Sequence, residues 1–452
     1  MNLLPVKKPN VKKTLKNILI SIFVPAVFIP LCLWGCSEKD TAVSRRESKQ
    51  LPQMDVWIFF DYNTPGTHYL DLWESLGETY GYQLNVQTFT TEELKDKLRI
   101  SLVCGELPDI FAVWGGSFPR FLFDAGACLP VQDYIRDSGL SFADGYLSTY
   151  TDGNTYIIPC LVEAYAITYA NTNLMEQMDL QIPETWDELI ALTDAVNTYN
   201  QDHGTAYVPV GFGNKDSWLG ELLYTMIVNR EDPYAFDRLR NHQETFDDPN
   251  DVFTDAAYKI LQLKEHQAFA PEFMQTGEVE SVENFVSGNT VLLPHQSTII
   301  YYLMEHMGED GIRVFQFPDC SGGKYPDYET YLMNANDTMT PGLCINSAAP
   351  YPEDAAKICL DFSRQVNQIN VTEYGYLNYM NDDQLTLPDD LPQPVLSFRD
   401  MVENARNCTS FWYATLPREE AKSWQNLTKK LYAGVLSPDE FTDAAQGCLI
   451  YP

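Results

Sequence analysis

The chain has 452 residues, of which 45% are hydrophobic and 13% aromatic, and its formal net charge is −33. This composition excludes a disordered acidic tail, and the excess of acids argues against nucleic acid or an anionic membrane surface as a partner. The length exceeds what one hydrophobic core usually serves, so we expect two bodies.

The first 35 residues are typical of an export signal. Five lysines and no acid stand in the first 16 residues, and an almost wholly apolar run follows from Ile18 to Trp34. A basic segment before an apolar core is the layout of a secretory signal. The run is at the short end for a membrane-spanning helix, which needs about 20 residues. We therefore expect residues 1–35 to be a signal peptide.

A single cysteine stands where the apolar run meets charged residues. The segment Leu33 to Cys36 resembles a bacterial lipobox, although Trp34 departs from the usual small or branched residue. On this interpretation the signal is removed and Cys36 becomes a lipid-bearing N-terminus, with residues 36–51 as a polar tether. An uncleaved N-terminal anchor is the alternative. Both interpretations place the rest of the chain outside the cytoplasm.

The residues after the tether alternate between strand and helix patterns. Apolar and alternating runs indicate strands, and two segments place apolar residues at helical spacing. The second of these begins with a capping box, Thr90 with Glu93, and the first stops at Gly81. We expect strands at 56–60, 83–89 and 108–114, and helices at 67–81 and 90–102.

This alternation predicts a parallel sheet with right-handed crossovers. Ligands of such sheets bind where loops leave the carboxyl ends of the strands. The loops after the first and third strands are therefore candidate ligand contacts, and they contain Asp61, Tyr62 and Asn63, and Trp114 to Gly116.

The later sequence is mainly helical. Two further capping boxes, Thr185 with Glu188 and Ser437 with Glu440, predict helix starts. Helical patterns also cover residues 351–366 and 418–434, whereas the proline- and acid-rich residues 385–398 are predicted to connect two bodies.

The cysteines beyond Cys36 leave two interpretations open. They are even in number but widely spaced, without a Cys-x-x-Cys pair, so buried free thiols and disulfides are both compatible with the sequence. They are Cys104, Cys128, Cys160, Cys320, Cys344, Cys359, Cys408 and Cys448.

Five segments, taken in order, resemble the extracellular solute-binding proteins of ABC importers, in the carbohydrate branch that includes maltodextrin-binding proteins. They carry the Gly-x-x-Pro-Asp strand end, the Asp-Gly-x-x-Tyr-x-x-Pro to Thr-Trp pattern, the Phe-x-x-Gly segment, the second crossing strand and the aromatic Phe-Trp-Tyr segment. These segments are residues 105–114, 152–189, 285–294, 342–362 and 408–415.

The resemblance implies an α/β, two-lobe periplasmic-binding-protein-like fold of type II, with mostly parallel sheets flanked by helices and a central cleft at the hinge. Lobe one would combine residues 52–163 and 342–395, and lobe two residues 166–340 and 399–452. The lobes would close on a solute and present it to permease subunits. We expect a monomer, exported and held by its lipid on the outer face of the bacterial cytoplasmic membrane.

The resemblance also suggests ligand contacts. Trp412 and Tyr413 lie on the segment that stacks on sugar in the family, although an aromatic core is the alternative. Glu163 matches a family glutamate that meets ligand at the first hinge, with a hinge salt bridge as the alternative. Trp114 lies near the family's cleft tryptophan, and Trp218 is a weaker candidate that could equally belong to the core.

One departure from the family concerns the ligand itself. Counting from Phe285 places Thr298 where maltodextrin-binding proteins bring a tryptophan to the cleft. His295 and Gln296 could supply hydrogen bonds there instead, with a solvated loop histidine as the alternative for His295. The sequence therefore favours a smaller or more polar sugar over maltodextrin.

Other functional classes have less support. The sequence contains no hydrolase, metalloprotease or phosphate-loop motif, and its six histidines are not spaced as metal ligands. We therefore predict a binding protein that is not an enzyme and has no metal or cofactor. A binder of polyamines or other non-sugar solutes, or the ligand-binding partner of a membrane sensor, would use the same closing lobes and stays open.

Overall fold

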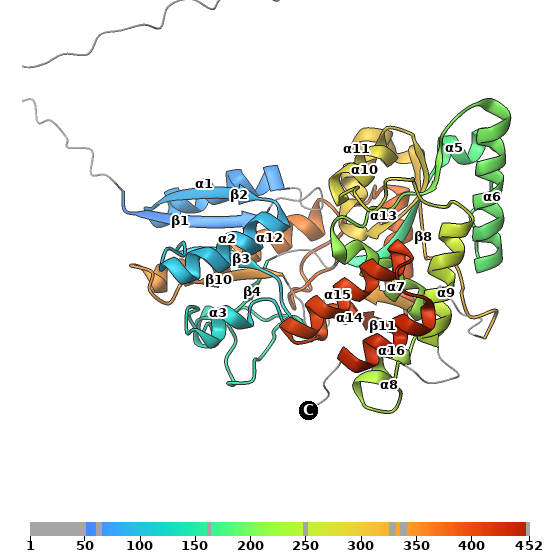
Figure 1. Cartoon of the computed structure of the whole chain (residues 1–452). Coiled ribbons are helices and arrows are strands. Elements are labelled where there is room, and N and C mark those ends of the chain that lie inside the picture. The colour runs from blue at the N-terminus through green and yellow to red at the C-terminus, as the bar shows by residue number, and fades with distance from the viewer. Residues whose placement is uncertain are drawn as a thin grey trace, which may run out of the picture. The chain divides into compact units, whose positions relative to one another are not determined.

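The computed structural model describes residues 51–59, 66–160, 164–246, 252–324, 331–334 and 341–448. Two β-sheets, each flanked by helices, carry these residues (Figure 1). The predicted signal peptide, Cys36 and nearly all of the tether lie outside the described residues. Among the helices that the structure describes, none is both long enough and apolar enough to span a membrane.

The first sheet has five strands in the order β2-β1-β3-β10-β4. They are β1 (Gln53–Phe59), β2 (Gln83–Phe89), β3 (Ile110–Val113), β4 (Ile158–Pro159) and β10 (Gly342–Ile345). β1 runs parallel to both β2 and β3, as the alternation predicts. β10 runs antiparallel to β3 and β4, so the sheet is mixed, but β1, β2, β3 and β4 all run in one direction and the sheet is mostly parallel, as predicted. The early alternation could not indicate this, because β10 comes from a distant part of the chain.

Helices pack on this sheet through a continuous apolar core. They are α1 (Gly66–Tyr80), α2 (Thr91–Cys104), α3 (Arg120–Asp124), α4 (Gln132–Ser138) and α12 (Pro352–Thr372). Trp73 of α1 is fully buried and stacks on Phe362 of α12, with ring centroids 4.0 Å apart. The predicted capping box is confirmed, because Thr90 and Glu93 cap each other's backbone at the start of α2. Gly81 ends α1 with φ of +74°, a conformation that favours glycine.

The second sheet has six strands, with the order β11-β9-β5-β7-β6 and with β8 also paired to β5. They are β5 (Tyr165–Asn171), β6 (Val208–Val210), β7 (Thr290–Gln296), β8 (Ile312–Phe315), β9 (Tyr331–Asn334) and β11 (Asn407–Ser410). Every residue of β5 is buried. β5 runs antiparallel to β7, β8 and β9, so this sheet is mixed as well.

More helices surround the second sheet than the first. They are α5 (Thr172–Gln177), α6 (Trp186–His203), α7 (Ser217–Glu231), α8 (Ala235–Arg240), α9 (Val252–Glu265), α10 (Glu278–Val286), α11 (Ile300–Met307), α13 (Gln393–Glu403), α14 (Trp412–Thr415), α15 (Arg418–Ala433) and α16 (Pro438–Cys448), with short 3₁₀ helices η1 (Ser297–Ile299) and η2 (Glu309–Gly311). The residues of α7 from Leu219 to Arg230 are all buried, because α9, α14 and α15 pack around it. The capping boxes predicted at Thr185 and Ser437 are confirmed.

The expected connection at residues 385–398 is partly wrong. Its last residues begin α13, and Val395 and Phe398 are buried in the core of the second sheet. Pro394 lies in the first turn of that helix, where proline's missing N–H and fixed φ are tolerated. The proposed lobe boundaries around residues 395–399 stay a prediction.

The structure decides the open question about cysteines for the described residues. All eight cysteines from Cys104 to Cys448 are free, and five of them are buried.

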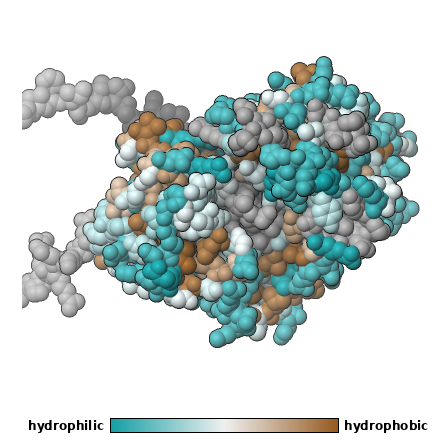
Figure 2. Space-filling view, turned by 90° about the horizontal axis from the view of Figure 1, so that it is seen from below, coloured by the Kyte–Doolittle hydropathy of each residue, from teal (hydrophilic) through white to brown (hydrophobic). Residues whose placement is uncertain are grey.

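Hydrophilic residues cover much of the face seen in Figure 2, with smaller hydrophobic patches between them, in agreement with the net charge of −33.

Candidate functional site

Four of the predicted ligand contacts fall on residues that the structure does not describe. They are Asp61, Tyr62, Asn63 and Glu163. Their assignment as ligand contacts stays a prediction. The site is therefore built from the described residues around them.

One hydrogen bond joins a loop of the first sheet to a helix beside the second. The backbone N–H of Ser117, in the loop after β3, donates to the carbonyl oxygen of Ala414 in α14 at 3.2 Å. Trp114 begins this loop, and Tyr413 directly precedes Ala414. Two predicted ligand residues that are far apart in sequence therefore lie on segments in contact.

Trp114 lies among aromatic and cationic groups. Its half-buried ring stacks on Phe59 with centroids 4.4 Å apart. The ammonium group of Lys95 lies 5.3 Å from the ring centroid and forms an ion pair with Glu92 at 2.7 Å. A cation over an indole ring is attracted by its π-electrons. Phe59 and Lys95 therefore occupy part of the surface on which a sugar ring would stack.

Trp412 is a core residue, contrary to the role predicted for it. Its side chain is 2% exposed, and its ring stacks on Phe236 at a centroid distance of 5.1 Å and an interplanar angle of 22°. Phe246 packs edge-on against the same ring. Such packing leaves no ring face for a solute, which is the aromatic-core alternative described above.

Tyr413 remains a candidate ligand contact, because its side chain is half-buried and lies at the margin of this core. Burial raises the pKa of its phenol, and the carboxylates of Glu221, Glu92 and Glu278 raise it further. The hydroxyl group is therefore protonated near neutral pH and able to donate a hydrogen bond. Glu92 lies in the first turn of α2, which packs on the first sheet, and Glu278 lies in the first turn of α10, which packs on the second. Helices from beside both sheets therefore place acidic groups near Tyr413.

Trp218, His295 and Glu278 form a second group of contacts. The half-buried ring of Trp218 packs edge-to-face on the imidazole of His295, with centroids 5.8 Å apart. The Nε2 atom of His295 is 3.5 Å from Oε1 of Glu278. Asp216 holds Glu278 in place, because its Oδ2 accepts the Glu278 backbone N–H at 2.8 Å.

Two buried polar side chains, His295 of this group and Thr298, have no side-chain hydrogen bond within the described ranges. Neither ring nitrogen of His295 has a hydrogen-bond partner among the described residues, and neither has the hydroxyl group of Thr298. Burial lowers the pKa of His295 to about 3, so its imidazole is neutral at physiological pH. Buried polar groups are nearly always paired in native proteins. A ligand with hydroxyl groups is one way to pair these.

We call Trp218, Glu278, His295 and Tyr413 the inner cluster. Two of them, Trp218 and Tyr413, were predicted as ligand contacts, and His295 was named as a possible donor. Gln296, the remaining prediction, is half-buried, and its carbonyl oxygen accepts the hydroxyl of Tyr169 at 2.7 Å. Glu278 was missed, because one acid among 63 Asp and Glu residues carries no distinguishing sequence signal.

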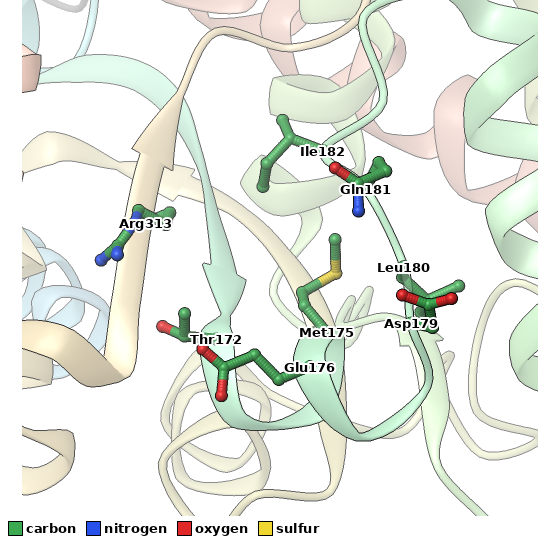
Figure 3. Close-up of a pocket in the computed structure, with 8 residues that line it drawn as sticks. All are labelled: Thr172, Met175, Glu176, Asp179, Leu180, Gln181, Ile182 and Arg313. Carbon is green, nitrogen blue, oxygen red and sulfur yellow. The ribbon is translucent and has the colours of Figure 1, made fainter.

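A separate hollow of about 360 Å³ lies beside α5 (Figure 3). We call it the outer hollow. Met175, Leu180 and Ile182 supply apolar surface, and the exposed Arg313 of β8 supplies a cation. It lies at the carboxyl end of β5, whereas the predicted ligand residue Glu163 precedes the start of that strand in the sequence. Seven residues of strand separate the two ends by roughly 20 Å.

The described residues contain no group of three or more His, Cys, Asp and Glu side chains that could hold a metal ion. The inner cluster offers instead two aromatic side chains, a carboxylate and an imidazole. Aromatic faces with a few convergent polar groups are typical of sites for small organic ligands.

The sequence model of one protein family, the bacterial extracellular solute-binding proteins, matches residues 70–356. No curated protein matches the sequence. Among solved structures, one described for xylan utilization by the thermophilic bacterium Caldanaerobius polysaccharolyticus has a TM-score of 0.75 at 22% identity, over 88% of this chain and 100% of that one.

Two further solved structures share the fold at lower identity. A chitin oligosaccharide binding protein has a TM-score of 0.73 at 17% identity, over 87% of this chain and 98% of its own. The maltose/maltodextrin-binding domain MalE from Bdellovibrio bacteriovorus, bound to maltotriose, has a TM-score of 0.65 at 16% identity, over 88% and 98%. These likenesses confirm the predicted two-lobe α/β fold.

Proposed function

Because the chain belongs to the family of bacterial extracellular solute-binding proteins, we propose that it captures a small saccharide and delivers it to the permease subunits of an ABC importer. The solute would be bound between the bodies built on the two sheets and released unchanged. The lobes would have the boundaries predicted from the sequence and would close by a hinge motion.

The inner cluster is the observation that supports this proposal most strongly. A sugar has apolar ring faces and a rim of hydroxyl groups, which suit the rings of Trp218 and Tyr413 and the polar atoms of Glu278 and His295. The solved relatives include a chitin oligosaccharide binding protein and a domain bound to maltotriose. A saccharide is therefore the solute class that we propose.

The absence of one aromatic residue that the family resemblance leads us to expect bears on the size of the saccharide. Thr298, with its unpaired hydroxyl, occupies the position where the sequence comparison expects a tryptophan. The site thus offers one aromatic surface fewer and one hydrogen-bonding group more. We propose a short or strongly polar sugar.

The membrane attachment belongs to the same proposal. A lipid on Cys36 would hold the binding protein beside its permease, and the polar residues up to 51 would give it reach. The lipobox-like residues before Cys36 support this part.

A second candidate is a polyamine or another cationic solute. It is favoured by the carboxylates of Glu92 and Glu278, which both act on Tyr413. Carboxylates pair with ammonium groups, and an aromatic ring attracts a cation. A sensor partner in place of the permease would use the same site.

A thermal-shift screen of the full-length chain in detergent tests the solute class. The probes are maltotriose, N-acetylchitotriose, xylotriose, their monosaccharides, and spermidine. A ligand at 100 times its dissociation constant stabilises by about 2.7 kcal/mol, which raises the unfolding midpoint by a few degrees. A shift with a saccharide supports the proposal, and a shift with spermidine alone replaces it by the cationic candidate. No shift with any probe contradicts both.

A further inference from the structure

Glu221 is a carboxylate buried in the middle of a helix. It lies on α7, and its side chain is 0% exposed. Its Oε1 atom accepts two hydrogen bonds, from the hydroxyl group of Thr225 at 2.7 Å and from the backbone N–H of Tyr413 at 3.3 Å. The carboxylate therefore connects a core helix to the first turn of α14, which carries an inner-cluster residue.

Other groups from α14 and α15 face the same carboxylate. The backbone N–H of Trp412 and the indole N–H of Trp424 favour its ionised form, although Oε2 has no hydrogen bond of normal geometry within the described ranges. The phenols of Tyr413 and Tyr432 are the titratable groups beside it. Tyr432 donates its own hydroxyl to the carbonyl oxygen of Gly220 at 3.0 Å.

We propose that Glu221 is a positioning residue for the ligand site, whose ionised carboxylate holds the first turn of α14 and thereby fixes Tyr413 for ligand binding. This inference rests on the proposed function, because it takes Tyr413 as a ligand contact.

The contact with Tyr413 depends on the charge of Glu221. Burial raises the pKa of Glu221 from 4.5 to about 7, so both charge states are populated near neutral pH. An ionised carboxylate accepts N–H groups more strongly than a protonated one. We therefore expect saccharide affinity to be about tenfold higher at pH 8 than at pH 6, the value of a hydrogen bond strengthened by charge. By linkage, binding near pH 7 should release protons.

Stability should change in the opposite direction. Between pH 4.5 and about 7 the folded protein holds this proton more tightly than the unfolded chain does, because burial raises the pKa. The contribution of Glu221 to stability is therefore present at low pH and is lost as the pH rises through about 7. At pH 8 the uncharged variant Glu221→Gln should unfold at a higher temperature than wild type while binding saccharide more weakly. A purely structural residue would not separate these two effects.

The matched control lies on the same helix. Glu231 is half-buried, desolvation raises its pKa to about 7, and it forms an ion pair with Lys259 at 2.8 Å. It stands at the carboxyl end of α7, ten residues from Glu221. Glu231→Gln thus removes a partly buried carboxylate with a similarly raised pKa while leaving the Glu221–Tyr413 contact in place.

Hydrogen–deuterium exchange of the full-length chain at pH 8, without ligand, tests the positioning. We expect the amides of residues 412–415 to exchange about tenfold faster in Glu221→Gln than in wild type, and at the wild-type rate in Glu231→Gln. Equal rates in Glu221→Gln and wild type would overturn the proposal.

Calorimetric titration at pH 6 and pH 8 with maltotriose, N-acetylchitotriose and xylotriose tests the coupling to ligand. We expect Glu221→Gln to bind at both pH values as weakly as wild type binds at pH 6, with Glu231→Gln following wild type. A tenfold pH dependence that survives in Glu221→Gln would overturn the inference. If wild type binds neither these sugars nor their monosaccharides, the proposed function is wrong, and the exchange rates still decide whether Glu221 positions α14.

Discussion

The outer hollow and the inner cluster differ in what they offer to a ligand. The outer hollow has about 360 Å³ of space, and beside its apolar side chains the polar residues that line it are mostly exposed, among them Glu176, Asp179 and Arg313. The inner cluster brings together side chains from α7, α10, β7 and α14, and it contains a buried imidazole for which the described part of the chain supplies no hydrogen-bond partner. The outer hollow has open space but no buried polar side chain among the residues that line it. The inner cluster has polar groups that are costly to bury unpaired.

This difference shows why open space is a poor guide to function. Exposed polar groups lose little when they remain in water, so the outer hollow needs no ligand to explain it. An unpaired buried nitrogen or hydroxyl lowers stability, and a protein that retains several of them in one place has a reason to do so. Four predictions test this distinction.

The largest effect on stability is expected at Trp412, the core residue next to Tyr413 of the inner cluster. Trp412→Ala removes a fully packed indole from the core and should lower the free energy of unfolding by about 3–5 kcal/mol, measured by urea denaturation. Trp218→Ala, at a half-buried position, should cost clearly less. If Trp412→Ala leaves stability unchanged and abolishes saccharide binding, Trp412 is a stacking residue and its assignment to the core is wrong.

The next effect separates the two neighbours Trp412 and Tyr413. Tyr413→Ala should weaken saccharide binding by about 2 kcal/mol, or roughly 30-fold, because an aromatic contact at the centre of a site contributes this much. Titration calorimetry measures it. Tyr413→Phe keeps the ring and loses the hydroxyl group, so it should retain most of the affinity. Equal affinity of Tyr413→Ala and wild type would remove Tyr413 from the site.

Acid should destabilise the inner cluster through His295. Burial depresses its pKa from 6.5 to about 3, so the unfolded chain binds the proton more tightly than the folded protein does. Stability from the neutral imidazole is present above pH 6.5 and is lost as the pH falls towards 3, which amounts to about 2 kcal/mol at pH 5. Denaturant titrations at pH 7 and pH 5 should show this loss as a difference between wild type and His295→Gln, because the opposite contribution of Glu221 is common to both proteins. An equal change of stability with pH in wild type and in the variant would assign the effect elsewhere.

The smallest effect is expected in the outer hollow. Arg313→Ala should change the free energy of unfolding by less than about 0.5 kcal/mol, because the side chain is exposed. Its saccharide affinity, measured by the same calorimetry, should equal that of wild type. A tenfold loss of affinity would show that the saccharide binds in the outer hollow and not at the inner cluster.

Local sequence signals predicted local structure well. The capping boxes at Thr90, Thr185 and Ser437 act within three or four residues, so they are visible without knowledge of the tertiary fold. The strand at 83–89 was predicted with its observed bounds for the same reason. The antiparallel place of β10 could not be predicted from such signals, because it depends on pairing between distant segments.

The candidate site was predicted only in part. The aromatic segment at Trp412 and Tyr413 was found by its resemblance to the family's aromatic segment, but the two adjacent rings have different surroundings, and only packing decides which one faces the core. Glu221 and Glu278 were not found at all. Their significance comes from burial and from neighbours brought by other elements, which a single sequence does not display.

The central place of β10 in the first sheet has a consequence for the order of folding. β10 pairs with β3 on one side and with β4 on the other, so residues 110–113 and 158–159 are joined through a strand that follows them by nearly two hundred residues or more. Closing such a long loop is slow compared with forming local contacts. The first body therefore cannot complete its sheet until most of the second has left the ribosome, and the N-terminal half of the nascent chain remains open to chaperones during that time.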